Sequence, residues 1–244
     1  MNGSGPRSAL SFLTPIGGAV APTSSALGWF PVVGAGIGAL LGLLWWATAH
    51  GWPLAVAAAL VVVADLALTG ILHLDGLIDS ADGLIPHMTR ERRLEVMREP
   101  TVGAFGISVA VVVLILRWAS LYSIHPSVLL LTGTWCASRA VMALVAANVP
   151  YARGTSGGLA SAFLSTERRG ATIAAGVVGT AGSLTCLLFW RPVGGAVALA
   201  AGLVVAGLAI WFAKRRLGGF TGDVLGATGV LFETTVLLVG SARW

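Results

Sequence analysis

The sequence predicts an all-α, polytopic integral membrane protein, a bundle of about seven transmembrane helices. Of its 244 residues, 56% are hydrophobic and only 10% are charged, and the mean hydropathy is +0.88. A soluble domain of this size does not need so much apolar surface. A helix needs roughly 20 residues to cross a hydrocarbon core of about 30 Å. Seven stretches of the chain are long and apolar enough to do so.

The predicted spans follow one another along the chain. They cover residues 29–50, 53–74, 103–123, 127–149, 170–190, 192–213 and 223–240. In the first span Gly34, Gly38 and Gly42 recur every four residues, which is typical of closely packed membrane helices. The apolar stretch before residue 29 is short and rich in Gly and Pro. We therefore expect residues 1–28 to form an interfacial or re-entrant segment, and residues 29–244 to form one membrane-embedded domain.

A short charged helix is predicted between the second and third spans. The stretch from Thr89 to Glu99 is dominated by Arg and Glu, whereas Leu94 and Met97 would face inward, and Pro100 ends the helix. This pattern is typical of a helix that lies on the membrane surface.

Basic residues predict the orientation of the bundle. Seven spans place the N-terminus and the loops 75–102, 150–169 and 214–222 on one side, with eleven Lys and Arg residues; the other side has only Arg191 and Arg243. Positively charged loops stay in the cytoplasm, so we expect the N-terminus and the long loops to be cytoplasmic. Contact with anionic lipid then accounts for the net charge of +5, and no nucleic-acid partner is needed.

Three carboxylates stand close together where the second span ends, in His73-Leu-Asp-Gly-Leu-Ile-Asp-Ser-Ala-Asp-Gly83. In a helix, Asp75 and Asp82 point roughly 20° apart and Asp79 points within about 60° of both. Like charges at the bilayer surface are costly unless a cation lies among them. Carboxylate oxygens suit Mg²⁺, so the pattern predicts one or two ions that bridge a diphosphate. The alternative is a helix end with solvated acids.

The residues around this cluster leave alternatives open. Gly76 removes side-chain bulk and would let a large group approach the backbone. His73 is either a base or phosphate ligand, or a buried packing residue. Asp65, inside the second span, is either a functional acid or the partner of Arg117 or Arg139.

Cations for binding phosphate are predicted in two further segments. In Lys214-Arg-Arg-Leu-Gly-Gly-Phe-Thr-Gly-Asp223, three basic residues precede a Gly-rich turn and a helix start. Backbone N–H groups at such a turn suit an anion, and Asp223 adds a carboxylate from another helix. The alternative is a loop whose basic residues anchor it to the membrane. Arg139 lies mid-span, where it either clamps phosphate in a cavity or neutralises an acid. Arg153, just outside the membrane, is expected either to contact a phosphate or to be a solvated loop residue.

Four segments together resemble the cobalamin synthase family, the adenosylcobinamide-GDP ribazoletransferases. In the family's order they are HLDGLIDSADGL (73–84), RERRLEVMREPTVGAFG (90–106), SRAVMAL (138–144) with PYAR (150–153), and RRLGGFTGDVLGA (215–227). The resemblance implies a Mg²⁺-dependent phosphotransferase in the bacterial plasma membrane, with its active site facing the cytoplasm. The implied reaction joins adenosylcobinamide-GDP to α-ribazole or its 5′-phosphate and releases GMP.

The resemblance also implies where the site lies. The family's acidic motif maps onto Asp75, Asp79 and Asp82, with His73 beside it, and its Gly-Asp motif maps onto Gly222 and Asp223. Together with the patterns above, this gives three expected sets. They are catalytic His73 and Asp79; metal ligands Asp75, Asp79, Asp82 and Asp223; and substrate contacts Arg139, Arg153, Lys214, Arg215, Arg216 and Gly222.

Two other functions suit a membrane protein with clustered acids. A CDP-alcohol phosphotransferase of phospholipid synthesis also uses aspartates at a membrane face, but its spacing of Asp-Gly and Ala-Arg is absent here. A transporter with Asp65, Arg117 and Arg139 along an ion pathway is disfavoured, because the charged motifs gather on one face. The expected partners are the two substrates and membrane lipid, and a homo-oligomer stays an open alternative.

Overall fold

The computed structural model describes residues 5–18, 20, 23–154 and 168–243. These residues form helices joined by loops, with no β-strand among them, so the all-α expectation is confirmed. The elements are α1 Gly5–Leu13, η1 Pro15–Gly17, η2 Leu27–Trp29, α2 Phe30–Gly51, α3 Leu54–Leu68, α4 Leu72–Leu84, α5 Arg90–Val96, α6 Ala104–Ser123, α7 Val128–Asn148, α8 Arg169–Trp190, α9 Pro192–Leu217 and α10 Gly222–Gly240.

The prediction of about seven spans is confirmed. In the described part of the chain, α2, α6, α7, α8, α9 and α10 are each long and apolar enough to cross a membrane. The pair α3 and α4 makes a seventh candidate, but the two helices meet at an angle of 87°. The prediction of one continuous helix over 53–74 is therefore wrong. Gly70 and Ile71 adopt left-handed backbone angles, with φ of 59° and 63°, and this conformation ends α3 and redirects the chain.

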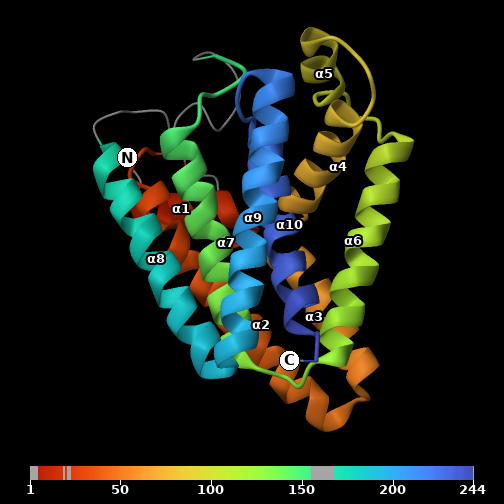
Figure 1. Cartoon of the computed structure of the whole chain (residues 1–244), viewed down its shortest axis with the longest axis vertical. Coiled ribbons are helices and arrows are strands. Elements are labelled where there is room, and N and C mark those ends of the chain that lie inside the picture. Colours follow the sequence, from red (N-terminus) through yellow and green to blue (C-terminus); the bar gives the residue numbers. More distant parts are fainter. Residues whose placement is uncertain (1–4, 19, 21–22, 155–167, 244) are drawn as a thin grey trace.

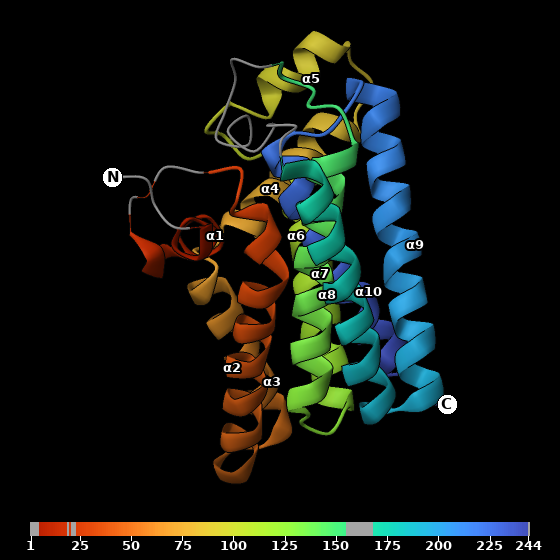
Figure 2. The same ribbon diagram turned by 90° about the vertical axis from the view of Figure 1, so that its left-hand side faces the viewer.

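The long helices stand side by side, and the polar connections gather at one end of the bundle (Figure 1). We call this end the α5 end, because α5 lies there; the chain finishes at the opposite end (Figure 1). Figure 2 shows α1 end-on beside the upright α2, so α1 lies across the bundle. At nine residues, it is about 14 Å long and too short to span. The placement of residues 1–28 in the lipid stays a prediction, as does the division at residue 29.

Small residues let α2 and α7 pack backbone to backbone. A Cβ on Gly42 would lie 2.6 Å from the Cα of Val128, and side chains on Gly34 and Gly38 would collide with the carbonyl oxygens of Trp135 and Leu131. The glycine pattern in the first span therefore marks a helix contact, as predicted. Close approach of this kind is a main source of stability between helices in lipid.

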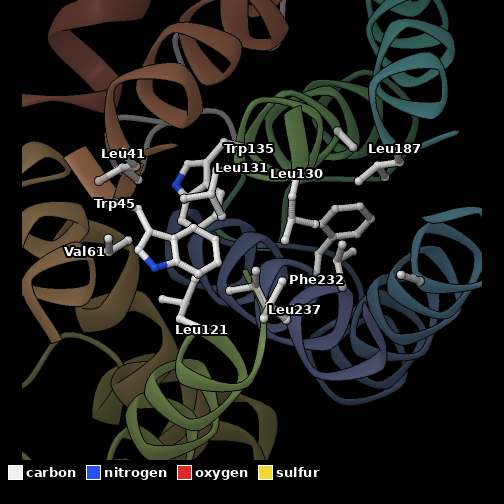
Figure 3. Packing of buried hydrophobic residues seen from close by; sticks show 14 of the residues in the cluster. Leu41, Trp45, Val61, Leu121, Leu130, Leu131, Trp135, Leu187, Phe232 and Leu237 are labelled. Carbon is white, nitrogen blue, oxygen red and sulfur yellow. The ribbon is translucent and has the colours of Figure 1, made fainter. Parts of the chain in front are cut away.

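The largest described cluster of buried apolar residues lies deep in the bundle, towards the end away from α5, and a second, with Leu84, Met97 and Leu217, lies near the α5 end. Side chains of α2, α3, α6, α7, α8 and α10 meet in the largest cluster (Figure 3). Trp45, Trp135, Leu131 and Phe232 are each at most 1% exposed. This packing holds the helix axes in place, so that the polar residues near the α5 end are presented from a rigid frame.

Candidate active site

α4 crosses α10 so closely that only glycine fits at position 76. A Cβ on Gly76 would lie 2.7 Å from the carbonyl oxygen of Asp223, and one on Gly226 would lie 3.2 Å from the Cα of His73. The expectation that Gly76 admits a large group is thus corrected, because the group that approaches is the first turn of α10. The crossing places Asp223 beside the acids of α4.

A cavity of about 200 Å³ opens at this crossing, and we call it the active-site cavity. Its lining residues are Phe12, Leu72, His73, Asp75, Met142, Tyr151, Arg153, Gly222, Asp223 and Gly226. Asp79 follows Asp75 by one helical turn, is half-buried, and interacts electrostatically with Asp75, Asp223 and Arg153. α4 and α10 therefore place two carboxylates, Asp75 and Asp223, and the Arg153 guanidinium in one cavity wall, whereas Asp79 lies outside the described lining.

Arg153 reaches this cavity because two loops are joined in front of α10. Tyr151 and Phe220 form an isolated β-bridge. In it the Ala152 N–H donates to the Phe220 carbonyl at 2.8 Å, and the Phe220 N–H donates to the Pro150 carbonyl at 2.9 Å. The loop that follows α7 is thereby fixed against the start of α10.

The start of α10 binds the side chain of Arg153. The guanidinium donates to the Asp223 carboxylate at 2.8 Å and to the Met97 carbonyl at 3.3 Å. The hydroxyl of Thr221 donates to the same carboxylate at 3.2 Å and caps α10 by accepting from the Val224 N–H. Asp223 and Arg153 are thus oriented by one another, at a helix N-terminus that favours an anion.

Several buried polar atoms at the cavity have no partner among the described residues. They are both ring nitrogens of His73 and the Nε of Arg153. Buried polar groups almost always have hydrogen-bond partners. Burial raises the pKa of the Tyr151 phenol, which keeps a neutral donor in the cavity wall. Unpaired donors and acceptors beside carboxylates are what a polar, phosphate-bearing ligand would satisfy.

A larger hollow of about 1250 Å³ lies at the other end of the bundle. It includes Arg191 and Arg243 but no Asp, Glu or His among its described lining residues. Two cations without an acid or a base give little means of catalysis. The smaller cavity at the α4–α10 crossing is therefore the better candidate for an active site.

Asp82, a predicted metal ligand, binds the start of α6 in this structure. Its two carboxylate oxygens accept hydrogen bonds from the N–H groups of Gly103, at 2.7 Å, and Gly106, at 2.9 Å, where α6 begins. Although Asp75 and Asp82 point in similar directions, seven residues of helix separate them by about 10 Å along the axis. Within the described ranges, no three His, Cys, Asp or Glu side chains lie close enough to hold a metal ion by themselves.

Arg139, a predicted substrate contact, lies in a buried ion pair in this structure. Its guanidinium pairs with Glu233 of α10 and donates to the hydroxyl of Ser138 at 2.9 Å, and the side chain is 1% exposed. Of the two alternatives for this residue, neutralisation of a buried acid is the one the structure shows. It is absent from the described lining of the active-site cavity.

Arg117 joins this pair into a buried network of four charges. It binds Asp65 at 2.5 Å and also pairs with Glu233, and the Trp135 indole donates to Asp65 at 2.9 Å. Asp65 is thus the partner of Arg117 rather than of Arg139. Two cations and two anions cancel in a region where an unpaired charge is costly. The network connects α3, α6, α7 and α10 below the active-site cavity.

Two of the cations at 214–216 make contacts within the fold, and all three lie outside the described wall of the cavity. Arg216 donates to the Leu84 carbonyl at 2.7 Å and covers the ring of Phe212. Arg215 stacks on Trp211, and Lys214 is exposed. None of the three cations belongs to the described wall of the active-site cavity. Two other predicted substrate contacts, Arg153 and Gly222, do belong to it. The prediction that this basic run binds substrate phosphate stays a prediction, which the described cavity wall does not support.

Five residues of the described cavity wall were not predicted as site residues: Leu72 of α4, Gly226 of α10, and Tyr151, Phe12 and Met142. Tyr151 belongs to the PYAR segment that carried the resemblance, but only its arginine was singled out. Phe12 comes from the N-terminal segment and Met142 from mid-α7. An apolar side chain in an apolar span gives no local signal of a site, so these two could be found only from the fold.

The comparisons with known proteins match this arrangement of segments. A family model described as cobalamin-5-phosphate synthase matches residues 5–241. The chain belongs to this family. The match includes α4, the loop with Arg153 and the start of α10, which together form the active-site cavity.

Relatives from several bacteria support the assignment to this family. An adenosylcobinamide-GDP ribazoletransferase of Chlorobaculum tepidum is 38% identical over 224 residues, which cover 91% of this chain and 87% of the relative. Proteins of the same name from Vibrio cholerae and Leptothrix cholodnii are each 35% identical and cover 86% of this chain. No solved structure matches the chain.

Proposed function

We propose that this protein is an adenosylcobinamide-GDP ribazoletransferase of cobalamin biosynthesis. It would transfer the phospho-cobinamide moiety to α-ribazole or its 5′-phosphate and release GMP. Membership of the family and the names of the relatives give the reaction. The observation that carries the proposal is the cavity where carboxylates of α4 and α10 meet Arg153 and unpartnered polar atoms.

The proposed reaction is a displacement at phosphorus. A ribose hydroxyl oxygen of α-ribazole bonds to the phosphorus next to the corrinoid aminopropanol arm. The bond from that phosphorus to the bridging oxygen of the diphosphate breaks, and GMP leaves with the bridging oxygen. The hydroxyl proton passes to a base. Such a reaction needs positioning and neutralisation of charge more than covalent help from the protein.

Mg²⁺ is the proposed cofactor, with Asp75, Asp79 and Asp223 as its protein ligands. Mg²⁺ is usually held by one or two carboxylates and completes its shell with water and substrate phosphates. Two carboxylates in one cavity wall, Asp75 and Asp223, with Asp79 one helical turn from Asp75, fit this preference. When bound, the ion would neutralise the negative charge of the diphosphate.

Residues of the chain itself would orient the diphosphate. Arg153 is already held by Asp223 and has an Nε without a described partner, so it can donate to a phosphate oxygen. Gly222 lies in the cavity wall at the first turn of α10, where backbone N–H groups favour an anion. His73 or one of the acids would accept the hydroxyl proton. The imidazole is suited to this by its two unpartnered nitrogens.

We also propose that the cavity faces the cytoplasm of a bacterial plasma membrane. The α5 end carries Arg90, Arg93, Arg153 and Arg216, whereas Arg191 lies at the other end. This asymmetry supports the orientation because Lys and Arg are enriched in cytoplasmic loops.

The test is an assay of GMP release by the purified full chain, given adenosylcobinamide-GDP and α-ribazole over a range of Mg²⁺ concentrations. We expect Mg²⁺-dependent release, and a loss of about 100-fold or more in Asp79→Asn and Asp223→Asn, since each removes charge stabilisation at the reacting group. Glu95→Gln, an exposed acid of α5, is the matched control and should keep full activity.

Near-normal turnover in both aspartate variants at limiting Mg²⁺ would contradict the site. The same preparation, supplied with a CDP-alcohol and a diacylglycerol acceptor, should release no CMP. Turnover in detergent solution, where no compartments exist, excludes transport as the source of the signal.

A further inference from the structure

A second cavity, of about 160 Å³, lies between α4, α6, α9 and α10. It shares none of its described lining residues with the active-site cavity. Its wall is almost wholly apolar and includes Leu77, Leu84, Phe212, Val224 and Leu231. An apolar cavity of about 150 Å³ is large enough to hold a benzene-sized guest and stays dry when empty of one. We call it the lateral cavity.

The lateral cavity opens towards the lipid. Its wall includes Ile85, which follows α4 and is 41% exposed. Leu208 and Trp211, which precede the lining residues Ala209 and Phe212 of α9, are 57% and 54% exposed, as expected for a helix that faces hydrocarbon. A guest therefore reaches the cavity from the bilayer rather than from water.

One polar atom in the lateral cavity has no partner. Ser80 is 5% exposed, lines the cavity, and its hydroxyl makes no hydrogen bond within the described part of the chain. A serine in a helix usually donates to the carbonyl four residues earlier, and Thr228 on the facing helix does so at 2.7 Å. The free hydroxyl of Ser80 calls for a ligand with an acceptor, such as an ester carbonyl.

Cations stand at the mouth of the lateral cavity, at the α5 end. Phe212 lines the cavity, and Arg215 and Arg216 follow it by three and four residues, so all three share a face of α9. Arg216 covers the Phe212 ring at 4.4 Å and donates to the Leu84 carbonyl. Leu84 follows Ser80 by one turn of α4, which is about 6 Å along the helix axis. A phosphate near these cations and an ester near Ser80 match the order of groups in a phospholipid.

We propose that the lateral cavity binds an anionic phospholipid. A segment of one acyl chain fills the apolar cavity, a glycerol ester accepts from Ser80, and the phosphate group lies against Arg215 and Arg216. The lipid packs behind the α4–α10 crossing, on the two helices whose other faces form the active-site cavity. It therefore braces that crossing, and the assignment does not depend on the reaction proposed above.

The experiment counts lipid on the full chain by native mass spectrometry, after purification in an uncharged detergent and titration with phosphatidylglycerol or phosphatidylcholine of the same acyl chains. The wild type should retain one phosphatidylglycerol in preference to phosphatidylcholine. Ala209→Phe places a ring in the cavity from α9 and should weaken retention at least tenfold. Gly207→Phe is the control on the same helix, because a Cβ there meets nothing within 4 Å.

A second variant tests the headgroup. Arg215→Gln leaves the cavity intact and should lower the preference for phosphatidylglycerol about fivefold. This factor corresponds to the attraction of about 1 kcal/mol between one basic residue and an anionic lipid. Equal retention by Ala209→Phe and Gly207→Phe would overturn the site. So would equal binding of the two lipids, or one-for-one displacement of the lipid by α-ribazole, which would assign the cavity to a substrate instead.

Discussion

Replacing Asp82 with Asn distinguishes a carboxylate that anchors α6 from one that binds a metal ion. In the structure both oxygens of Asp82 accept from backbone N–H groups, of Gly103 at 2.7 Å and Gly106 at 2.9 Å, and the residue is 9% exposed. The contact lies at the N-terminus of α6, where the helix dipole favours a negative charge. Asn keeps the size of the side chain but loses the charge and one acceptor.

The expected loss of stability follows from these contacts. A hydrogen bond to a charged group contributes about 1.5–3 kcal/mol, and a charge at a helix terminus adds about 0.3–1 kcal/mol. Asn would keep one bond, now uncharged, and would turn its amide towards the other N–H. We therefore expect Asp82→Asn to lower the free energy of unfolding by about 2–3 kcal/mol. For a chain of this size that is a fall in Tm of about 4–12 °C.

The assay combines thermal unfolding in one detergent with the Mg²⁺ dependence of GMP release, measured well below both Tm values. For Asp82→Asn we expect the lower Tm and a half-saturating Mg²⁺ concentration within about twofold of the wild type. Asp79→Asn is the matched comparison from the same helix. It should show the reverse, a nearly unchanged Tm and a raised Mg²⁺ requirement, because Asp79 is half-buried and interacts with Asp75 and Asp223.

One outcome would refute the reasoning about Asp82. If Asp82→Asn unfolds within 1 °C of the wild type, and needs about tenfold more Mg²⁺ for the same rate, the carboxylate is a ligand. The contacts at the start of α6 would then be incidental, and the three acids of α4 would act together as the sequence pattern suggested.

Three further changes test other parts of the structure. Gly76→Ala forces α4 and α10 apart, because its Cβ would lie 2.7 Å from a backbone oxygen. Steady-state assays should show kcat reduced at least tenfold. Unchanged kinetics would show that the crossing of α4 and α10 does not determine the geometry of the site. Glu233→Gln removes the negative charge that pairs with both Arg117 and Arg139. It should lower the free energy of unfolding, measured with denaturant, by about 3–5 kcal/mol. A loss below about 1 kcal/mol would contradict the proposed importance of the charge network. Arg153→Lys keeps the charge but loses the Nε donor, so KM for the corrinoid substrate should rise about tenfold. A lower kcat with an unchanged KM would show that Arg153 does not contact the diphosphate in the bound substrate.

Much of the fold could be predicted because it depends on local properties of the chain. Hydropathy alone located the seven spans, and the spacing of Gly34, Gly38 and Gly42 marked the face on which α2 meets α7. The break between α3 and α4 was missed. Hydropathy runs on without interruption through Gly70 and Ile71, and only their left-handed backbone turns the chain.

The site was predicted in part. Asp75 of the acidic motif, Arg153 and the Gly-Asp pair at the start of α10 line one cavity, whereas Asp79 and Asp82 are outside its described wall. Arg139 could not be assigned, because its partner Glu233 lies 94 residues away on a helix whose rotation no local pattern gives. Arg216 was taken for a phosphate ligand because it follows two other cations, yet it binds the end of α4.

By itself the sequence determined a multi-pass helical membrane protein, its family, and the end of the bundle where the charged motifs gather, since these follow from composition and the order of motifs. Only the tertiary structure decided which charges share a space. The direction in which a side chain leaves a helix can be counted from the sequence. Which groups that side chain contacts also depends on its distance along the helix axis and on the neighbouring helix. Asp82 shows this most clearly: it points the same way as Asp75, lies about 10 Å further along the helix, and meets the amides of α6 instead of the active-site cavity.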